Sequence, residues 1–307
     1  MKKYLIFILL IILIAAAGFR LTFLPVSGDN AEEVQFSVKK GEGSRDIALH
    51  LEKENLIRWA PAFRIYVLSR GIAGDLKAGE YLLSPSMGIP EISEKLVNGD
   101  VLKIKVTIPE GFTVKQIEER LGLELLGDDL EGFLFPDTYQ FSFGFSGKEA
   151  IEAMKDNFEK KLAKDLREEI ARQEKTIFEI VTMASLIEKE VISLEDKKLV
   201  SGILWKRLEI GMPLQVDATL AYILEETWDF DEMRREVALA RDIDSPYNTY
   251  KYLGLPPGPI CNPGLDSMIA AVYPTESDYW YYLSTPQGET VFSETLAEHS
   301  AAKNRYF

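Results

Sequence analysis

The stretch KTIFEIVTMASLIEKEV, residues 175–191, is an apolar run with helical spacing that ends in three charged positions, Glu188, Lys189 and Glu190. An α-helix turns by about 100° per residue, so Glu188 falls on the side that carries Ala184 and other apolar residues of the run. Glu190 falls on the opposite side, which also carries polar residues. The pattern therefore predicts that Glu188 is the desolvated carboxyl, whereas Glu190 is solvated or ion-paired.

A desolvated carboxyl has a raised pKa and can keep its proton near neutral pH. A general acid in glycosidic cleavage needs that protonation state. The alternative is structural, with a buried Glu188 tied to a lysine or arginine from another part of the chain. The helical pattern by itself leaves both interpretations open.

The composition limits the possible functions. The chain has 307 residues, enough for two domains, and a formal net charge of −14, which repels phosphate backbones and argues against nucleic acid as a partner. Cys261 is the one cysteine, so an intramolecular disulfide is excluded. The two histidines, His50 and His299, lie far apart in sequence, which argues against a metal enzyme.

The N-terminal stretch MKKYLIFILLIILIAAAGFRLTFLPV, residues 1–26, carries two lysines and then no charge before Arg20. A membrane-spanning helix needs about 20 apolar residues, and Arg20 can snorkel so that residues 21–26 lengthen the span. We expect a cytoplasmic tip and a transmembrane anchor here, with the rest of the chain on the periplasmic side of the inner membrane. The alternative is a cleaved signal peptide with small residues at 15–17.

A short polar linker, residues 27–33, leads to a small module predicted over residues 34–103. FSVKKGEGSRDIALHLEKENLI, residues 36–57, has the pattern of a strand, a turn and a helix, with Ser44 expected at the N-cap. A second helix and a strand entered through Gly79 follow. The order strand, helix, helix, strand is similar to that of a LysM-type glycan-binding module.

Residues 104–307 are predicted to form a larger domain of mixed character. VTIPEGFTVKQIEERLG, residues 106–122, repeats the strand, turn and helix pattern with Thr113 as the helix cap. Helical patterns dominate from residue 147 to 211, and two strand-like runs precede a last helix. The fold class expected from these patterns is α+β.

The motif MPLQVDAT, residues 212–219, places Gln215, Asp217 and Thr219 at alternating positions. On an extended segment these three side chains would face one side and could hydrogen-bond sugar hydroxyls and acetamido groups. The alternative is that Asp217 or Thr219 caps the helix that follows.

The motif SPYNTY, residues 245–250, brings Tyr247, Asn248 and Thr249 together after a Ser-Pro turn. A tyrosine ring can stack on a sugar face, and asparagine and threonine supply hydrogen-bond donors and acceptors. The alternative is ordinary turn chemistry.

Four motifs, ASLIEKE, LWKRLEIGMPLQVDATLAYIL, SPYNTYKYLGLPPGPICNPG and EGFLFPDTY, together resemble the MltG (YceG-like) family of endolytic murein transglycosylases over residues 34–307. The resemblance implies a membrane-anchored lytic transglycosylase that works without a cofactor on nascent peptidoglycan. Such an enzyme cleaves the β-1,4 bond between N-acetylmuramic acid and N-acetylglucosamine inside a glycan strand, and leaves a 1,6-anhydro-muramic end.

The resemblance also implies roles for particular residues. The catalytic glutamate of the EKE motif corresponds to Glu188, Gln215 is favoured as a site residue beside it, and the YNTY motif is a family signature. Glycan-polymerising penicillin-binding synthases are the implied partners. Two other functions stay open: a non-catalytic wall-binding scaffold, and a muramidase that adds water and leaves reducing ends.

Overall fold

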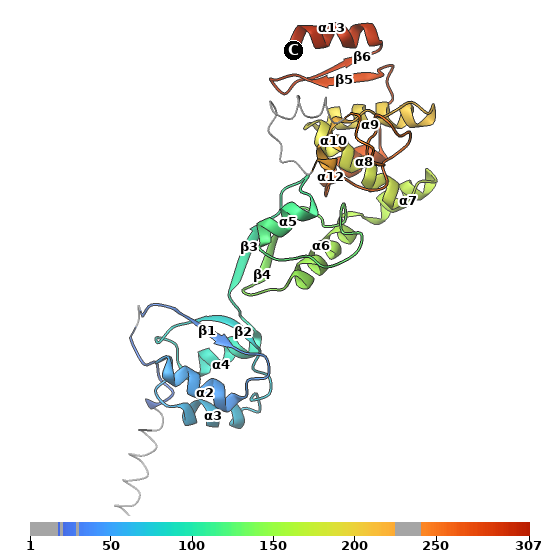
Figure 1. Ribbon diagram of the computed structural model, residues 1–307. Helices are drawn as coiled ribbons and strands as arrows, with labels where there is room; N and C mark the ends of the chain where they lie inside the picture. Colours follow the sequence, from blue (N-terminus) through green and yellow to red (C-terminus); the bar gives the residue numbers. More distant parts are fainter. Residues whose placement is uncertain (1–17, 19–20, 29–30, 225–240) are drawn as a thin grey trace, which may run out of the picture. The chain divides into compact units, whose positions relative to one another are not determined.

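The computed structural model describes residues 18, 21–28, 31–224 and 241–307, which divide into two compact units (Figure 1). The first unit contains residues up to 105 together with 140–145, and the second contains 106–139 and 146–307. Both units combine helices with two-stranded sheets, so the α+β class is confirmed.

Residues 1–17 and 19–20 of the predicted membrane anchor lie outside the described residues, whereas residues 21–26, expected to lengthen the span, are described and contact the first unit through Phe23, Pro25 and Val26. Among the helices of the described ranges, none has the length and apolar character needed to cross a bilayer.

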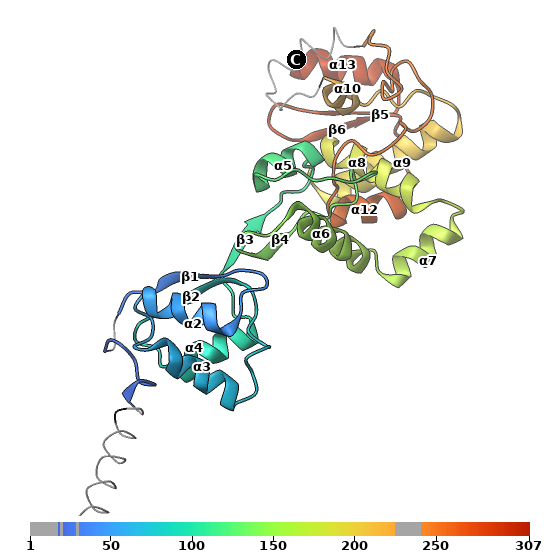
Figure 2. The same ribbon diagram turned by 60° about the horizontal axis from the view of Figure 1, so that its bottom comes forward.

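The first unit is built on the antiparallel pair β1 (Val34–Val38) and β2 (Gly79–Leu83). Helices α2 (Ser44–Lys53) and α3 (Ala60–Ser69) connect the two strands, and α4 (Ile89–Asn98) follows them. This is the strand, helix, helix, strand order expected from the sequence. The helices lie on one side of the strands (Figures 1 and 2) and enclose a core that includes Phe36, Ile47, Leu51, Phe63, Val67, Tyr81, Leu83, Ile92 and Leu96.

The two helix caps expected from the sequence have different outcomes. The hydroxyl of Thr113 accepts a hydrogen bond of 3.3 Å from the backbone N–H of Gln116 at the start of α5 (Val114–Leu121), so that cap is confirmed. The expectation for Ser44 is wrong, because the helix begins at Ser44 itself and the extended residue before it, Gly43, occupies the N-cap.

Strands β3 (Lys103–Thr107) and β4 (Thr138–Ser142) pair with each other, and each belongs in part to both units. The second unit continues with a series of helices: α6 (Gly147–Lys161), α7 (Lys164–Arg172), α8 (Ile177–Glu190), α9 (Leu194–Glu209), α10 (Asp217–Ile223) and α12 (Leu265–Val272). The antiparallel hairpin of β5 (Tyr281–Ser284) and β6 (Thr290–Ser293) and the terminal helix α13 (Leu296–Tyr306) complete it.

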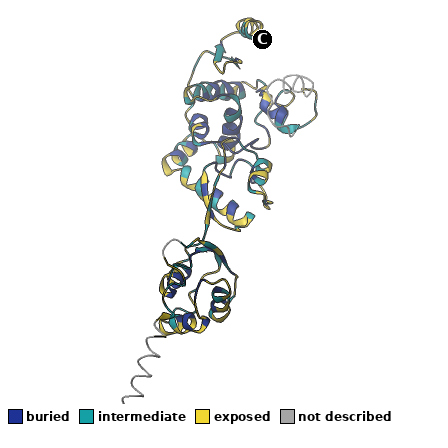
Figure 3. Cartoon of the chain, turned by 90° about the vertical axis from the view of Figure 1, so that its left-hand side faces the viewer, coloured by how far each residue is buried: buried dark blue, intermediate teal, exposed yellow. Residues whose placement is uncertain are grey.

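Helix α8 is the centre of the second unit. It contacts α9, α10 and α12, and the eight residues from 180 to 187 are all buried (dark blue in Figure 3). A helix that is covered on every side has no single inward face. The charged end of α8 therefore cannot be divided into a buried side and a solvent side by helical geometry alone.

Candidate active site at the end of helix α8

Glu188 is held by three hydrogen-bond donors. Lys197 of α9 donates from Nζ to Oε1 over 3.1 Å, and Oε2 accepts from the backbone N–H of Gly264 at 2.9 Å and from the hydroxyl of Ser267 at 2.6 Å. The side chains of Glu188 and Lys197 are 9% and 4% exposed. The N-terminus of α12 adds its positive dipole to this environment. These contacts correspond to the structural alternative, a buried glutamate tied to a lysine.

A second carboxyl, Glu110, lies against the same turn. A side chain at Gly264 would collide with the Glu110 carboxyl, so the backbone can approach only because this residue is glycine. Burial raises the pKa of Glu110, and the negative charge of Glu188 raises it further. The two carboxyls thus share one turn, with Lys197 as the neighbouring cation.

Glu190, the last residue of α8, has the properties that the sequence suggested for Glu188. Burial raises its pKa to about 7, and the nearby carboxylate of Asp217 contributes in the same direction. The hydroxyl of Tyr282, the backbone N–H of Ala218 and the charge of Arg207 act in the opposite sense and limit the rise. A carboxyl with a pKa near 7 can hold a proton at neutral pH and release it readily. Glu190 is half-buried and lies near the charge of Arg207, so it is neither fully solvated nor in a simple ion pair.

The groups around Glu190 come from segments far apart in the sequence. Arg207 of α9 is 5% exposed and donates to the backbone carbonyls of Leu214 (2.7 Å) and Trp280 (3.0 Å). Leu214 precedes α10 and Trp280 precedes β5, so Arg207 links these two elements. Tyr250 donates a hydrogen bond to Asp217. This network brings Asp217 and the hairpin strand to the carboxyl of Glu190.

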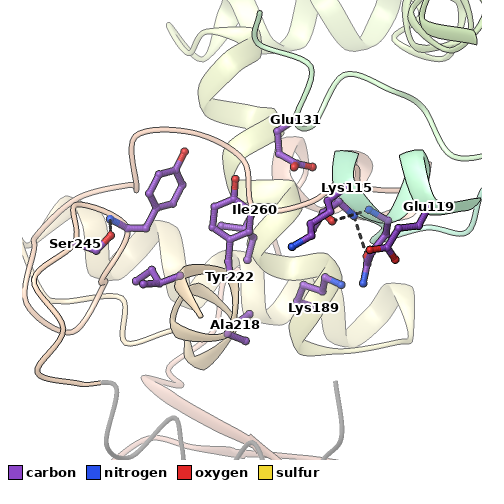
Figure 4. Close-up of a pocket in the computed structure, with 13 residues that line it drawn as sticks. Lys115, Glu119, Glu131, Lys189, Ala218, Tyr222, Ser245 and Ile260 are labelled. Atoms are coloured by element: carbon purple, nitrogen blue, oxygen red, sulfur yellow. Dashed lines mark hydrogen bonds between the residues drawn. The ribbon is translucent and has the colours of Figure 1, made fainter. Parts of the chain in front are cut away.

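A cavity of about 430 Å3 borders this site. Ala218 links the two, because its backbone N–H bonds Glu190 while the residue also lines the cavity. Figure 4 shows Lys115, Lys189 and Glu131 reaching toward the same space, with Tyr222 across from them. The remaining lining residues are Thr113, Gln116, Glu119, Ala221, Ile223, Ser245, Tyr247 and Ile260.

Glu131 is a further carboxyl with altered acidity in this cavity. Burial raises its pKa to about 7. The backbone hydrogen bond from Val114 (3.1 Å) and the charge of Lys189 lower the pKa and so limit this rise. Asn262 donates to its other oxygen over 3.1 Å. Glu131 is therefore oriented by two donors and faces a space large enough for part of a ligand.

The structure separates the three residues of the SPYNTY motif. Tyr247 lines the cavity, and its ring lies 5.1 Å from that of Tyr222. Asn248 and Thr249 are buried, and their side chains bond within the protein: Asn248 donates to the carbonyls of Arg241 and Ile243, and Thr249 accepts from the N–H of Val216. These two residues brace the loop, whereas Tyr247 is open to a ligand.

The MPLQVDAT motif is not one extended segment. Helix α10 begins at Asp217, Val216 occupies its N-cap, and Thr219 is buried within it. The expectation of a common face is therefore wrong, and so is the alternative that Asp217 or Thr219 is the cap. Asp217 belongs to the Glu190 network, while Gln215 is exposed, has a φ of 55° and is not among the cavity-lining residues.

Three groups that shape the site were missed by sequence reasoning: Glu131, Arg207 and Tyr282. Each lies in a motif noted above or in the last strand pair, but only tertiary contacts distinguish it from its neighbours. Within the described parts of the chain, no group of three or more His, Cys, Asp or Glu side chains is placed to hold a metal ion.

Comparison with known proteins identifies relatives of this chain. The model of the YceG-like family matches residues 36–305. An endolytic murein transglycosylase from Bacillus subtilis is 32% identical, and the match covers 92% of this chain and 87% of that protein. An endolytic murein transglycosylase from Streptococcus pneumoniae is 28% identical, and the match covers 91% of this chain and 59% of that protein. A crystal structure of a yceG-like protein from Listeria monocytogenes covers 89% of this chain and all of its own, with 32% identity and a TM-score of 0.57.

Fold and site together define a two-unit α+β protein with two glutamates at the end of a buried helix, whose Lys189 lines a cavity with both polar and apolar walls. The match over most of the chain identifies the family: this protein belongs to the YceG-like family.

Proposed function

We propose that this chain is an endolytic murein transglycosylase, the activity named for its relatives from Bacillus subtilis and Streptococcus pneumoniae. It would cleave the β-1,4 bond between N-acetylmuramic acid and N-acetylglucosamine within nascent glycan strands, form 1,6-anhydro-muramic ends and thereby end strand elongation. The observation that carries the proposal is the Glu190 carboxyl, which can hold a proton near neutral pH and lies beside the cavity.

The site offers two glutamates as the general acid, and their surroundings differ. Glu188 is the residue expected from the family resemblance, and it is held by three donors, one of them the cation Lys197. Burial and the negative charge of Asp217 favour the protonated form of Glu190, and its donors only partly offset them. We therefore assign the acid role to Glu190, and to Glu188 the role of joining the ends of α8, α9 and α12.

The chemistry needs one carboxyl that acts twice. Protonated Glu190 donates its proton to the departing glycosidic oxygen as the bond to muramic C1 breaks. The resulting carboxylate, stabilised by the hydroxyl of Tyr282 and the N–H of Ala218, then removes the proton of the C6 hydroxyl, and O6 closes onto C1. The enzyme regains its proton, and no water is added.

Digestion of purified sacculi followed by mass spectrometry tests the proposal. Wild-type protein should release products with anhydro ends. Glu190→Gln should be folded and inactive, and Glu188→Gln should retain anhydro-forming activity in proportion to its folded fraction. Reducing ends would identify a muramidase instead, and the absence of cleavage by the wild type would favour a wall-binding scaffold. If Glu188→Gln is folded and inactive while Glu190→Gln is active, the acid is Glu188.

The location and partners follow from the same proposal. The apolar residues 4–19 would anchor the chain in the inner membrane, with both units on the periplasmic side and glycan-polymerising penicillin-binding synthases nearby. The order β1, α2, α3, β2 supports a LysM-like glycan-binding role for the first unit. Membrane fractionation tests the anchor, and co-sedimentation with sacculi of a Glu190→Gln variant tests glycan binding.

A further inference from the structure

We propose that the exposed face of helix α3 lies on the lipid surface of the membrane and orients the first unit there. The inference rests on the membrane anchor proposed above, and it adds a second membrane contact made by the folded unit itself.

Helix α3 is apolar on two sides. One side, with Ala62, Phe63 and Val67, is buried in the core of the unit. The other carries Ile65 and Leu68, which are 46% and 55% exposed. Exposed Arg64 and Ser69 share this outer side, so the two aliphatic side chains stand between polar residues, as in a helix that lies at a membrane interface.

The sequence of α3 and its flanks is basic, and a carboxylate that meets this helix is that of Glu52 on α2, which accepts from the N–H of Ala60 over 3.2 Å. Residues 55–74 contain three arginines, Arg58, Arg64 and Arg70, and no Asp or Glu, although the whole chain has a net charge of −14. Trp59, 42% exposed, stands at the start of the helix. Exposed aliphatic residues flanked by tryptophan and arginine are typical of a segment at the boundary between acyl chains and anionic head groups.

The segment that follows the apolar N-terminal sequence is fixed to this part of the unit. The ring of Phe23 lies 6.0 Å from that of Tyr66 on α3, and Arg58 donates to the carbonyls of Pro25 (2.7 Å) and Val26 (3.1 Å). The N–H of Ile89 donates to the carbonyl of Phe23 over 3.1 Å. Within the first unit, the segment lies beside α3 (Figures 1 and 2).

These contacts leave little chain between the anchor and the unit. Phe23 is only four residues beyond the end of the apolar run at residue 19, and four residues span at most about 14 Å when extended. Leu21 and Leu24, in the same segment, are 60% and 55% exposed. A bilayer that holds residues 4–19 would therefore lie within reach of the α3 face, which identifies lipid as the partner.

Depth measurement on the full chain in liposomes of phosphatidylglycerol and phosphatidylethanolamine tests the inference. A fluorophore is attached to Leu68→Cys, and separately to the matched control Leu49→Cys, whose leucine is 51% exposed on α2 next to Glu52 and Asp46. The native Cys261 is buried, and burial raises the pKa of its thiol, so it should stay unlabelled. Quenching by spin-labelled lipid is compared with quenching by iodide in the water.

We expect several-fold stronger lipid quenching at position 68 than at position 49, and a reduced signal at 68 when Arg64→Glu and Arg70→Glu are added. Equal quenching at both positions in membrane-bound protein would overturn the inference and leave the anchor intact. Protection of position 68 from both quenchers would also overturn it, because a protein surface would then cover the face. Failure of the wild-type chain to float with liposomes would refute the anchor itself.

Discussion

The ammonium of Lys197 lies 3.1 Å from Oε1 of Glu188, and both side chains are almost completely buried. This ion pair joins two consecutive helices of the second unit, α8 and α9. Removing one partner of a buried pair leaves the other charge without compensation, which typically costs about 3–5 kcal/mol.

Lys197→Met should therefore lower the free energy of unfolding by about 3 kcal/mol or more. The double variant Glu188→Gln, Lys197→Met should be more stable than Lys197→Met alone, because the unpaired carboxylate is gone. Urea denaturation of the two single variants and the double variant gives the coupling energy. Lys198→Met, at the next position, is the control and should change stability by about 0.5 kcal/mol or less. Additive effects of the two substitutions would contradict a coupled pair.

The pH dependence of catalysis should follow Glu190. Its pKa is about 7 against an ordinary value of 4.5, so the acid form that the first step requires is lost as the pH rises through about 7. We expect the rate of anhydro-product formation at saturating glycan to fall above that pH. The pH–rate profile measures this, and an alkaline limb that begins well above pH 8 would point to another acid.

The same shift affects stability. A carboxyl whose pKa is higher in the folded chain than in the unfolded chain binds its proton more tightly when folded. Its contribution to the free energy of unfolding is fully present below about pH 4.5 and is lost as the pH rises to about 7. Glu190→Gln should remove part of this loss, on the order of 1–3 kcal/mol between those two pH values. Urea midpoints at pH 4.5 and 7.5 check it, and an unchanged difference between the two pH values would contradict the shift.

Tyr282→Phe removes a hydroxyl that hydrogen-bonds the Glu190 carboxyl and lowers its pKa. The variant should have a higher Glu190 pKa, so its alkaline limb should move to higher pH. Its turnover should fall by about 10-fold, because the carboxylate formed in the first step loses a donor worth about 1.5 kcal/mol. Tyr281→Phe, on the other face of the strand, is the control. A drop in turnover with no movement of the pH profile would indicate a purely structural role for Tyr282.

Gly264→Ala should disturb the turn that supplies a donor to Glu188. The added methyl group would collide with the carboxyl of Glu110, the end of a flexible side chain that can move aside, so the cost should be at the low end of overpacking, about 1 kcal/mol. Removing the obstacle with Glu110→Ala should restore part of the loss in the double variant. Thermal unfolding measures both effects. Gly74→Ala, where the new methyl group meets nothing within 4 Å, is the control, and an equal loss there would refute the explanation.

Several features of this protein could be read from the sequence because they depend on local chemistry. Helical and alternating patterns predicted the α+β class, and Thr113 was predicted as a helix cap and is one. The EKE motif at the end of an apolar helix located the region of the candidate site. Each of these depends on residues within a few positions of one another, where backbone geometry is nearly constant.

The difference between Glu188 and Glu190 could not be read in this way. Helix α8 is enclosed by α9, α10 and α12, and what separates the two glutamates at its end is the partner that each meets. Lys197 and the start of α12 stabilise the charge on Glu188, whereas Tyr282, Ala218 and Asp217 surround Glu190. Sequence determined that a carboxyl would be buried at this helix end, and only the tertiary structure decided which one can keep its proton, because acidity depends on charges and donors brought from distant parts of the chain.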